Sequence, residues 1–253
     1  MKPNNQFYNN IYIGGKMRVL AIVPAYNEEK SIASVINELK CYNFIDILVI
    51  NDGSKDDTLL VVRKLNVEVI DIKKNHGIGT AMKIGYQYAK DKGYDIAVQV
   101  DADGQHDVAK INDLIRMIQE NHFDMVIGSR YITKTRYRAT LLRYLGIKYF
   151  SLLIHVLYKT PIKDITSGYR AVNKRVINYF AKHYPSYYPE IPMLANLITL
   201  DYKICEVPVE MRKRQAGKSS ISFFNAVYYV FKITCVCIKE QIKFKKINRN
   251  KNK

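Results

Sequence analysis

The chain has 253 residues, of which 48% are hydrophobic and 25% are charged, with 12 glycines, 7 prolines and 4 cysteines. These fractions are typical of a globular protein, and they exclude an intrinsically disordered chain, a collagen-like chain and a small scaffold held by disulfides. The cysteines are too few and too scattered for a disulfide framework or a zinc site, so we expect reduced thiols in a cytosolic compartment.

The net charge of +17 lies in the second half of the chain. Residues 1–130 contain 16 Lys and Arg against 17 Asp and Glu, a balance of −1, whereas residues 131–253 contain 24 against 6, a balance of +18. A basic solvated surface would spread the charge evenly. A segment this basic indicates an anionic partner, such as nucleic acid, a phosphorylated ligand or an anionic lipid surface.

The chain order of apolar patterns predicts alternating strands and helices. Residues 1–16 are rich in asparagine and lack the apolar core of a signal peptide, so we expect a flexible leader. Continuous apolar runs then predict buried strands at Val19–Pro24, Ile45–Ile50, Val67–Ile70, Ile96–Val100 and Met125–Gly128. Helical spacing between them predicts helices at Ser31–Lys40, Thr58–Leu65, Thr80–Lys90 and Ile111–Glu120. Such alternation indicates βαβ units and a parallel sheet in an α/β domain.

Polar residues gather where four of these strands end. The segments are PAYNEE (24–29), NDGSKDDT (51–58), DADGQHD (101–107) and SRY (129–131). Each of them alone is an ordinary turn. Because the carboxyl ends of parallel strands lie at one edge of the sheet, where open α/β sheets bind their ligands, we expect the functional site at this edge.

Asp101 and Asp103 are alternate residues at the end of the fourth predicted strand, and Gln105 follows them. Oxygen ligands of this kind suit Mg²⁺ or Mn²⁺, which would bridge the phosphates of a bound nucleotide. An isolated Asp-x-Asp pair is only a weak indication of a metal site, so the order of the other motifs matters more.

Seven motifs follow one another between residues 18 and 221: VPAYNEE, NDGSKDDT, NHGIGTAMKIGY, VDADGQHD, IGSRY, DITSGYRA and EVPVEMRKRQAGKSS. This ordered set resembles glycosyltransferase family 2, and within it the polyprenyl-phosphate sugar transferases similar to dolichyl-phosphate mannose synthase. The resemblance implies a GT-A fold, which is a Rossmann-like domain with a mostly parallel sheet that binds a nucleotide sugar, over residues 17–221. Residues 222–253 would form an amphipathic helix and a basic tail.

The resemblance also implies roles on the donor side. Asp52 matches the acidic residue that meets the base or ribose, and a carboxylate there can accept hydrogen bonds from either. Asp101 and Asp103 match the metal and diphosphate motif, Gln105 matches a third metal-side ligand, and His106 matches no ligand, so we expect it to face solvent or cap a loop. The other residues expected to contact the nucleotide sugar are Pro24, Ala25, Tyr26, Glu28, Asn75, Gly77, Gly79 and Ala102.

The implied reaction is displacement of a nucleoside diphosphate from the anomeric carbon, with inversion, and the acceptor decides which further residues it needs. A sugar hydroxyl needs a carboxylate base, for which Asp164 is the candidate. A lipid phosphate is already an anionic nucleophile and needs a cationic clamp, and Asp164 would then orient a loop or hold an arginine. The residues expected in the clamp are Arg130, Arg143, Arg214 and Lys218, with a solvated basic turn at Arg212 and Lys213.

Two apolar segments are candidates for contact with a membrane, and neither is a clear spanning helix. Leu141–Tyr158 carries apolar residues at 141, 145, 149, 152 and 156, a helical stripe with Arg143, Lys148 and His155 expected on other faces. Phe223–Ile238 would rise only about 24 Å as a helix, short of the roughly 30 Å hydrocarbon core. Lys232 near its centre would cost about 3 kcal/mol in a spanning helix. We therefore expect a helix in the membrane plane, with a helix packed on the sheet as the alternative.

The C-terminal tail, residues 239–253, strengthens the expectation of a membrane surface. It contains seven Lys and Arg against one Glu. Near an anionic leaflet, each basic residue contributes about 1 kcal/mol to binding. We expect a peripheral or juxtamembrane protein at the cytoplasmic face of the cell membrane, and stable anchoring would be helped by a small membrane-protein partner.

Three functions stay open from the sequence. The first is a metal-dependent hexosyl- or N-acetylhexosaminyl-transferase that moves a sugar, with a UDP-sugar favoured as donor, to a polyprenyl phosphate for cell-envelope polysaccharide or glycan synthesis. The second keeps the donor and uses a sugar hydroxyl of a growing polysaccharide as acceptor. The third is a basic nucleic-acid-binding protein, which explains the tail but leaves the acidic edge without a purpose, so we expect no nucleic acid.

Overall fold

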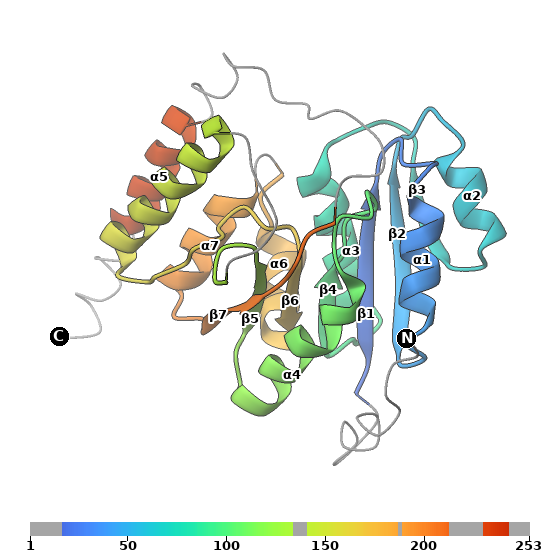
Figure 1. Ribbon diagram of the computed structural model, residues 1–253, viewed down its shortest axis with the longest axis horizontal. Coiled ribbons are helices and arrows are strands. Elements are labelled where there is room, and N and C mark those ends of the chain that lie inside the picture. Colours follow the sequence, from blue (N-terminus) through green and yellow to red (C-terminus); the bar gives the residue numbers. More distant parts are fainter. Residues whose placement is uncertain (1–16, 134–140, 187–188, 213–229, 243–253) are drawn as a thin grey trace.

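A mixed β-sheet forms the centre of the molecule (Figure 1), for which a computed structural model describes residues 17–133, 141–186, 189–212 and 230–242. Its strands in these ranges are β1 (Val19–Ala25), β2 (Ile45–Asp52), β3 (Glu68–Ile72), β4 (Ile96–Gln99), β5 (Met125–Ser129), β6 (Arg170–Asn173) and β7 (Ile204–Pro208). They lie in the order β3-β2-β1-β4-β6-β5-β7. Neighbouring strands are parallel, except that β6 runs antiparallel to both β4 and β5.

Helices cover both faces of the sheet. They are α1 (Ile32–Lys40), α2 (Thr58–Lys64), α3 (Ile78–Asp91), α4 (Ile111–Asn121), α5 (Leu141–Tyr158), α6 (Lys174–His183) and α7 (Glu190–Thr199), together with a helix over residues 230–242. Successive residues of a strand point to opposite faces, so Leu20 of β1 packs in the core with α3, α6 and α7, whereas Val19 and Ala21 pack in the core with α1 and α4.

The structure confirms the α/β class and the predicted strands and helices up to residue 129. Their bounds differ from the predicted ones by at most two residues. The sequence does not reveal β6 and β7, because each is a short segment that contains a charged residue. β6 begins with Arg170, and β7 contains Glu206 and ends with Pro208.

The helix over residues 230–242 lies beside α5 (Figure 1). Its Ile233 and Cys237 are buried in the same core as Phe150 and Ile154 of α5. Tyr158 donates a hydrogen bond from Oη to the carbonyl oxygen of Cys237 at 2.9 Å. The expected helix at Phe223–Ile238 is therefore present over its described part, continues to residue 242, and has one side packed on the domain.

Three further expectations concern membrane-spanning helices, the cysteines and the two ends of the chain. In the described ranges, no helix is both long enough and apolar enough to cross a bilayer. The four cysteines are free thiols. The leader 1–16 and the tail 243–253 lie outside the described residues.

Candidate functional site

The loops after β1 and β2 are joined into one unit at the carboxyl edge of the sheet. The backbone amide of Asn27 donates to Oγ of Ser54 at 3.0 Å, and the amide of Lys55 donates back to Oδ1 of Asn27 at 2.8 Å. The amide of Glu28 donates to Oγ1 of Thr58 at 2.8 Å. These bonds fix residues 24–29, in which Ala25 is buried, Pro24 and Glu28 are half-buried and Tyr26 is exposed.

Asp52 fixes a third loop to the same unit. Its buried carboxylate accepts hydrogen bonds from the backbone amides of His76 at 2.9 Å and Gly77 at 2.7 Å. Gly53 has φ +69°, and a Cβ there would lie 2.6 Å from the amide nitrogen of Asn75, so only glycine allows this approach. Because a carboxylate offers about four acceptor positions, the two amides leave Asp52 able to bind a ligand donor.

The glycines of the third loop have different roles. Gly77 has φ +86° and precedes α3, with open space where a Cβ would be. At Gly79, a Cβ would collide with the carbonyl oxygens of Pro185 and Ser186. The small size of Gly79 therefore allows the chain after α6 to approach α3, and its predicted approach to the nucleotide stays a prediction.

Asp101 is held on several sides at the end of β4. Its Oδ1 accepts a hydrogen bond from Nε2 of Gln99 at 3.0 Å. Its Oδ2 lies 3.5 Å from Nε2 of His106, and its backbone amide donates to Nδ1 of the same ring at 3.1 Å. A Cβ on Gly168 would lie 2.5 Å from Oδ2. The carboxylate therefore has a fixed position between the strand, the His106 ring and the backbone of Gly168.

Asp103 and Gln105 lie in the loop that follows, and Ala102 between the two aspartates is buried. Asp103 is half-buried, and its Oδ1 accepts from the amide of Gln105 at 3.0 Å. The side-chain nitrogen of Gln105 donates to the carbonyl oxygen of Arg212 at 3.5 Å. The side-chain oxygen is then the atom of Gln105 that a metal would bind.

The donor set fits a hard divalent cation. Two carboxylates and an amide oxygen are ligands typical of Mg²⁺ and Mn²⁺ sites that are completed by substrate phosphates. Within the described ranges, no group of three His, Cys, Asp or Glu side chains is placed to hold a metal ion. Asp101, Asp103 and Gln105 would therefore need oxygens of a bound ligand to complete the coordination.

His106 is not solvent-facing, which corrects one of the two expectations for this residue. It is 3% exposed and stacks on Tyr169, with the ring centroids 4.8 Å apart and the planes 12° from parallel. Its backbone forms an isolated antiparallel bridge with Met211. His106 thus connects the loop of Asp101 to the segment that follows β7.

Arg130 and Asp164 form a buried ion pair at the end of β5. Both are at most 2% exposed. Nε and Nη2 of Arg130 donate to the two carboxylate oxygens at 2.7 Å each, and the Arg130 backbone amide donates to Oδ2 at 2.9 Å. The amides of Lys163 and Asp164 donate to the carboxylate of Glu206, both at 2.8 Å. Asp164 therefore holds an arginine, and the pair links β5 to β7.

The remaining basic residues lie in three parts of the chain. Arg212 is exposed, as expected for a solvated turn, and its guanidinium also bridges Glu38 at 2.6 Å and Asp107 at 3.1 Å. Arg143 lies in the first turn of α5. Lys213, Arg214 and Lys218 lie outside the described residues, and their predicted roles stay predictions.

Sequence analysis missed two charged residues near this edge. Arg170 of β6 is 1% exposed, pairs in register with Gln99, and donates from Nη2 to the carbonyl oxygen of Ile165 at 2.9 Å. Glu190 lies in the first turn of α7, where burial raises the pKa of its carboxyl group and the Arg170 charge offsets part of the rise. The one sequence feature that could have identified these two residues is a charged residue within an apolar segment.

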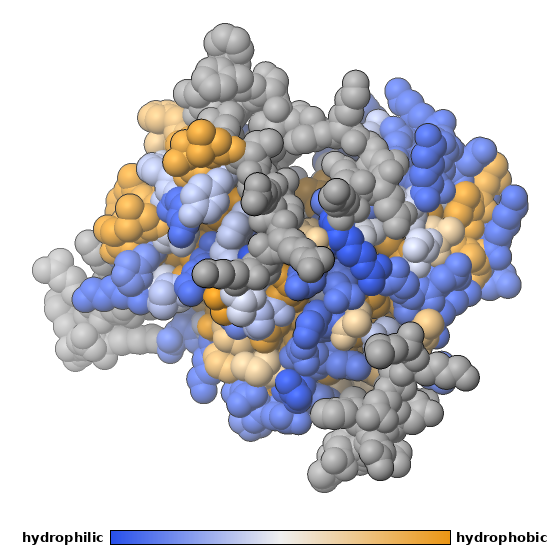
Figure 2. Space-filling view, in the orientation of Figure 1, coloured by the Kyte–Doolittle hydropathy of each residue, from blue (hydrophilic) through white to orange (hydrophobic). Residues whose placement is uncertain are grey.

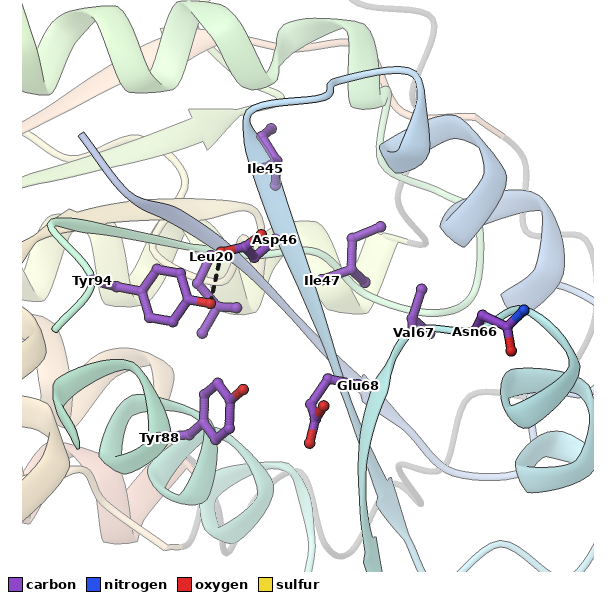
Figure 3. Close-up of a pocket in the computed structure, with 9 residues that line it drawn as sticks. All are labelled: Leu20, Ile45, Asp46, Ile47, Asn66, Val67, Glu68, Tyr88 and Tyr94. Atoms are coloured by element: carbon purple, nitrogen blue, oxygen red, sulfur yellow. Dashed lines mark hydrogen bonds between the residues drawn. The ribbon is translucent and has the colours of Figure 1, made fainter. Parts of the chain in front are cut away.

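An open cleft of about 400 Å³ lies at the opposite end of the sheet (Figure 3). Tyr94, Tyr88, Asp46 and Glu68 line it beside apolar residues of β1 to β3, and Tyr94 donates from Oη to Asp46 at 2.8 Å. Leu20, Asp46 and Glu68 stand at the amino-terminal ends of their strands. No residue of the predicted site lines this cleft, so it is a separate feature.

Comparison with solved structures defines the class of protein. Glucosyl-3-phosphoglycerate synthase from Mycobacterium tuberculosis, in complex with Mn²⁺, uridine diphosphate and phosphoglyceric acid, matches with a TM-score of 0.68 and 18% identity over 89% of this chain and 78% of that chain. The same enzyme with Mn²⁺ and UDP-glucose matches with a TM-score of 0.66 and 18% identity over 88% and 79%. These matches place the chain among α/β proteins of the GT-A type.

The sequence comparisons then give the family. The family described as Glycosyl transferase family 2 matches residues 20–180, and the chain belongs to it. A UDP-N-acetylglucosamine–dolichyl-phosphate N-acetylglucosaminyltransferase of Methanococcus voltae is 33% identical over 65% of this chain and 72% of its own length. The polyprenol monophosphomannose synthase of Mycolicibacterium smegmatis is 29% identical over 85% of each chain. The undecaprenyl-phosphate mannosyltransferase of Micrococcus luteus is 29% identical over 81% and 88%.

These relatives confirm the family and the polyprenyl-phosphate branch that the motifs indicated. The chain is therefore a glycosyltransferase. The relatives differ in the sugar that their names carry, which is N-acetylglucosamine in one and mannose in two.

Proposed function

We propose that this glycosyltransferase moves a sugar from a nucleotide sugar to a polyprenyl phosphate, with inversion at the anomeric carbon, at the cytoplasmic face of the cell membrane. The observation that carries the choice of acceptor is the state of Asp164. Arg130 donates hydrogen bonds of 2.7–2.9 Å to both carboxylate oxygens of Asp164, which is fully buried, so the candidate base for a hydroxyl acceptor is already occupied. A phosphate monoester is anionic at neutral pH and needs no base.

The donor would lie over the joined loops of the first half. Asp52 would accept from the base or ribose with the acceptor positions that His76 and Gly77 leave open. Asp101 and Asp103, with Gln105, would hold a Mg²⁺ or Mn²⁺ ion against the diphosphate. When bound, this ion supplies stabilisation of the charge that develops on the leaving diphosphate. A UDP-sugar is favoured because one relative is named for UDP-N-acetylglucosamine and the structural neighbours hold uridine nucleotides.

The acceptor phosphate would be bound by cations of the second half. Arg143, Arg214 and Lys218 are the candidates, since arginine matches phosphate oxygens bidentately. Arg130 would act through Asp164, by fixing the end of β5 and the segment 163–166 rather than by touching the phosphate. The product would be a sugar linked to a lipid phosphate, for cell-envelope polysaccharide or glycan synthesis.

Glu190 supports a second candidate, transfer to a sugar hydroxyl. Its carboxyl group has a raised pKa through burial, which is a property of catalytic bases. If the acceptor were a hydroxyl, Glu190→Gln would lower kcat by about 10²-fold or more and remove an ionisation from the pH profile. With a phosphate acceptor, the same variant should keep kcat within about tenfold and show no such loss of an ionisation.

One assay tests the proposal. The full chain would be incubated with Mn²⁺ or Mg²⁺, undecaprenyl phosphate and a panel of radiolabelled UDP- and GDP-sugars. We expect label in an acid-labile lipid product that is extracted into organic solvent. Label found only in long glycans would overturn the lipid acceptor in favour of the second candidate. Salt-sensitive DNA binding without any sugar transfer would overturn both.

A further inference from the structure

The apolar stripe of α5 faces outward. Leu141, Leu145, Leu152 and Val156 are 55–74% exposed. The opposite side of the same helix packs in the core through residues such as Phe150 and Ile154. A helix that is apolar on both sides is typical of a helix with a second apolar neighbour or of one at a membrane. The exposed side therefore needs a partner.

The helix over residues 230–242 extends this surface. Phe231, Ile238 and Ile242 are 70%, 45% and 52% exposed, and their spacing of seven and four residues keeps them on one side. Tyr149 of α5 and Thr234 join the two helices by a hydroxyl–hydroxyl hydrogen bond of 3.0 Å. Figure 2 shows hydrophobic atoms gathered over these helices, at the left of the view. We call these seven exposed apolar residues of the two helices the two-helix face.

The exposed charges on the two-helix face are positive, and the acidic residue of the second helix, Glu240, is half-buried. Lys148 is exposed and lies within the α5 stripe rather than on another face, since it stands four residues before Leu152. Lys232 and Lys239 are exposed on the neighbouring helix. α5 contains no Asp or Glu, and the segment 243–253 adds six Lys and Arg without an acidic residue. An apolar surface with basic borders is complementary to a bilayer with anionic headgroups.

We propose that the two-helix face docks on an anionic lipid bilayer, with both helices in the plane of the headgroups. α5 supplies four of the seven apolar residues, so it is a principal part of the contact, which the sequence assigned to residues 222–253. In an isologous dimer through this face, the lysines of two copies would approach one another and repel, whereas anionic lipid attracts them. This docking rests on the proposed function, since the face would bring the enzyme to the membrane that contains the acceptor lipid.

The two-helix face also adjoins the functional edge. The ring of Tyr131, which directly follows Arg130, lies 6.2 Å from the ring of Tyr144 in the first turn of α5. A bilayer in contact with α5 would therefore lie next to the end of β5 and to the first turn of α5, which contains Arg143, one of the candidate ligands of the acceptor phosphate.

Tryptophan fluorescence tests the contact directly, because the chain contains no tryptophan. Leu152→Trp places one reporter on the two-helix face, and Leu60→Trp places one on α2 at a site that is 54% exposed. With vesicles of phosphatidylcholine and phosphatidylglycerol, we expect a blue shift and quenching by brominated lipid for Leu152→Trp alone. Equal responses from both variants, or none from either, would overturn the proposal.

Introducing negative charge into the apolar surface gives a second measurement. Leu145→Glu/Leu152→Glu should lower the vesicle partition coefficient by about 100-fold, at about tenfold for each substitution, whereas Leu60→Glu should leave it within twofold. Unchanged partition of the double variant would overturn the proposal. The oligomeric state without lipid would be measured by light scattering. A wild-type dimer that becomes a monomer in the double variant would also overturn the proposal, because the face would then bind a second copy of the chain.

The choice of acceptor separates this inference from the proposed function. The double variant should keep its transfer rate with a short-chain, water-soluble prenyl phosphate and lose about tenfold or more with undecaprenyl phosphate in vesicles. Loss with both acceptors would overturn the docking role. If the wild-type chain transferred no sugar to either of the two acceptors, the proposed function would be overturned. The docking would still be tested by the vesicle measurements, which do not depend on transfer.

Discussion

The two halves of the carboxyl edge hold their buried carboxylates in different ways. In the first half, Asp52 is bound by two neutral backbone amides of the loop before α3. In the second half, Asp164 is bound on both oxygens by the charged guanidinium of Arg130. A carboxylate that accepts from two backbone amides keeps part of its hydrogen-bond acceptor capacity, whereas both oxygens of Asp164 are engaged by its paired arginine. The proposed donor site therefore lies in the first half, whereas the buried ion pair of the second half fixes the end of β5.

The largest expected effect tests the binding side of this comparison. Asp103→Asn should lower metal-dependent transfer by about 10³-fold or more, because it removes a charge from the set that would hold the ion against the diphosphate. The melting temperature should change by less than about 3 °C, since Asp103 is half-buried in a loop.

Metal titration and a matched variant complete this test. Mn²⁺ affinity, measured by electron paramagnetic resonance, should fall together with the transfer rate. Asp113→Asn on α4, where the carboxylate pairs at the surface with Lys110 and Arg116, should retain wild-type values of both. Wild-type transfer by Asp103→Asn would remove this residue from the metal site.

The structural role of the second half is tested by breaking the buried ion pair between Arg130 and Asp164. Arg130→Met should lower the free energy of unfolding by about 3–5 kcal/mol, because Asp164 is left as an uncompensated buried charge. Urea titration would measure it.

The double variant Arg130→Met/Asp164→Leu is the control for the pair. It should recover the larger part of the loss, since an apolar pair of similar volume replaces two charges. If Arg130→Met kept wild-type stability and lost only its response to the acceptor, the guanidinium would be a phosphate ligand and the contrast between the halves would fail.

Gly168→Ala tests the contact between the two halves, where the backbone of Gly168 lies against the carboxylate of Asp101. The new Cβ would lie 2.5 Å from Oδ2 of Asp101, so the carboxylate has to move. We expect transfer to fall by about 10²-fold, the effect of a displacement of about 1 Å at a reacting centre. Gly146→Ala on α5 meets open space and should keep full transfer while gaining about 0.5–1 kcal/mol of stability. Equal activity of the two variants would show that the position of Asp101 does not matter.

The smallest effect concerns the joined loops of the first half. Burial opposes ionisation of Asp56, but hydrogen bonds from Thr58 and Glu29 lower the pKa of this carboxyl below 3.8 in the folded chain. The stabilisation is therefore present above the unfolded pKa and is lost as the pH falls through the lower folded pKa. The difference in urea midpoint between the wild type and Asp56→Ala should be constant above about pH 5 and shrink below about pH 4. A difference that grows on acidification would contradict this sign.

The sequence predicts the first half of the fold well because its signals are local. Runs such as that of β1 are continuously apolar, as buried parallel strands are, and glycine and aspartate turns mark their ends. β6 has four residues and begins with the buried Arg170, so neither its length nor its pattern distinguishes it from a loop. Its antiparallel direction depends on pairing with β4 and β5, which no local pattern encodes.

In the candidate site, too, local features can be predicted from the sequence and tertiary contacts cannot. The location of Asp101 and Asp103 in the loop after β4 follows from the apolar run that precedes them. The bonds that determine whether a carboxylate is available are tertiary: Asp164 is 34 residues from Arg130, and the donors to Asp52 are backbone amides 24 and 25 residues away. Periodicity likewise places the apolar residues of α5 on one side without saying whether that side faces the core or the outside.

The anchoring of the last described helix has a mechanical consequence. A flexible tether would let a catalytic domain rotate freely above a lipid surface. Here Ile233 and Cys237 are inserted in the core, and Tyr158 bonds the main chain of the same helix. A bilayer that engages this helix therefore sets the tilt of the whole sheet, so that every docked molecule presents the same edge to the lipid.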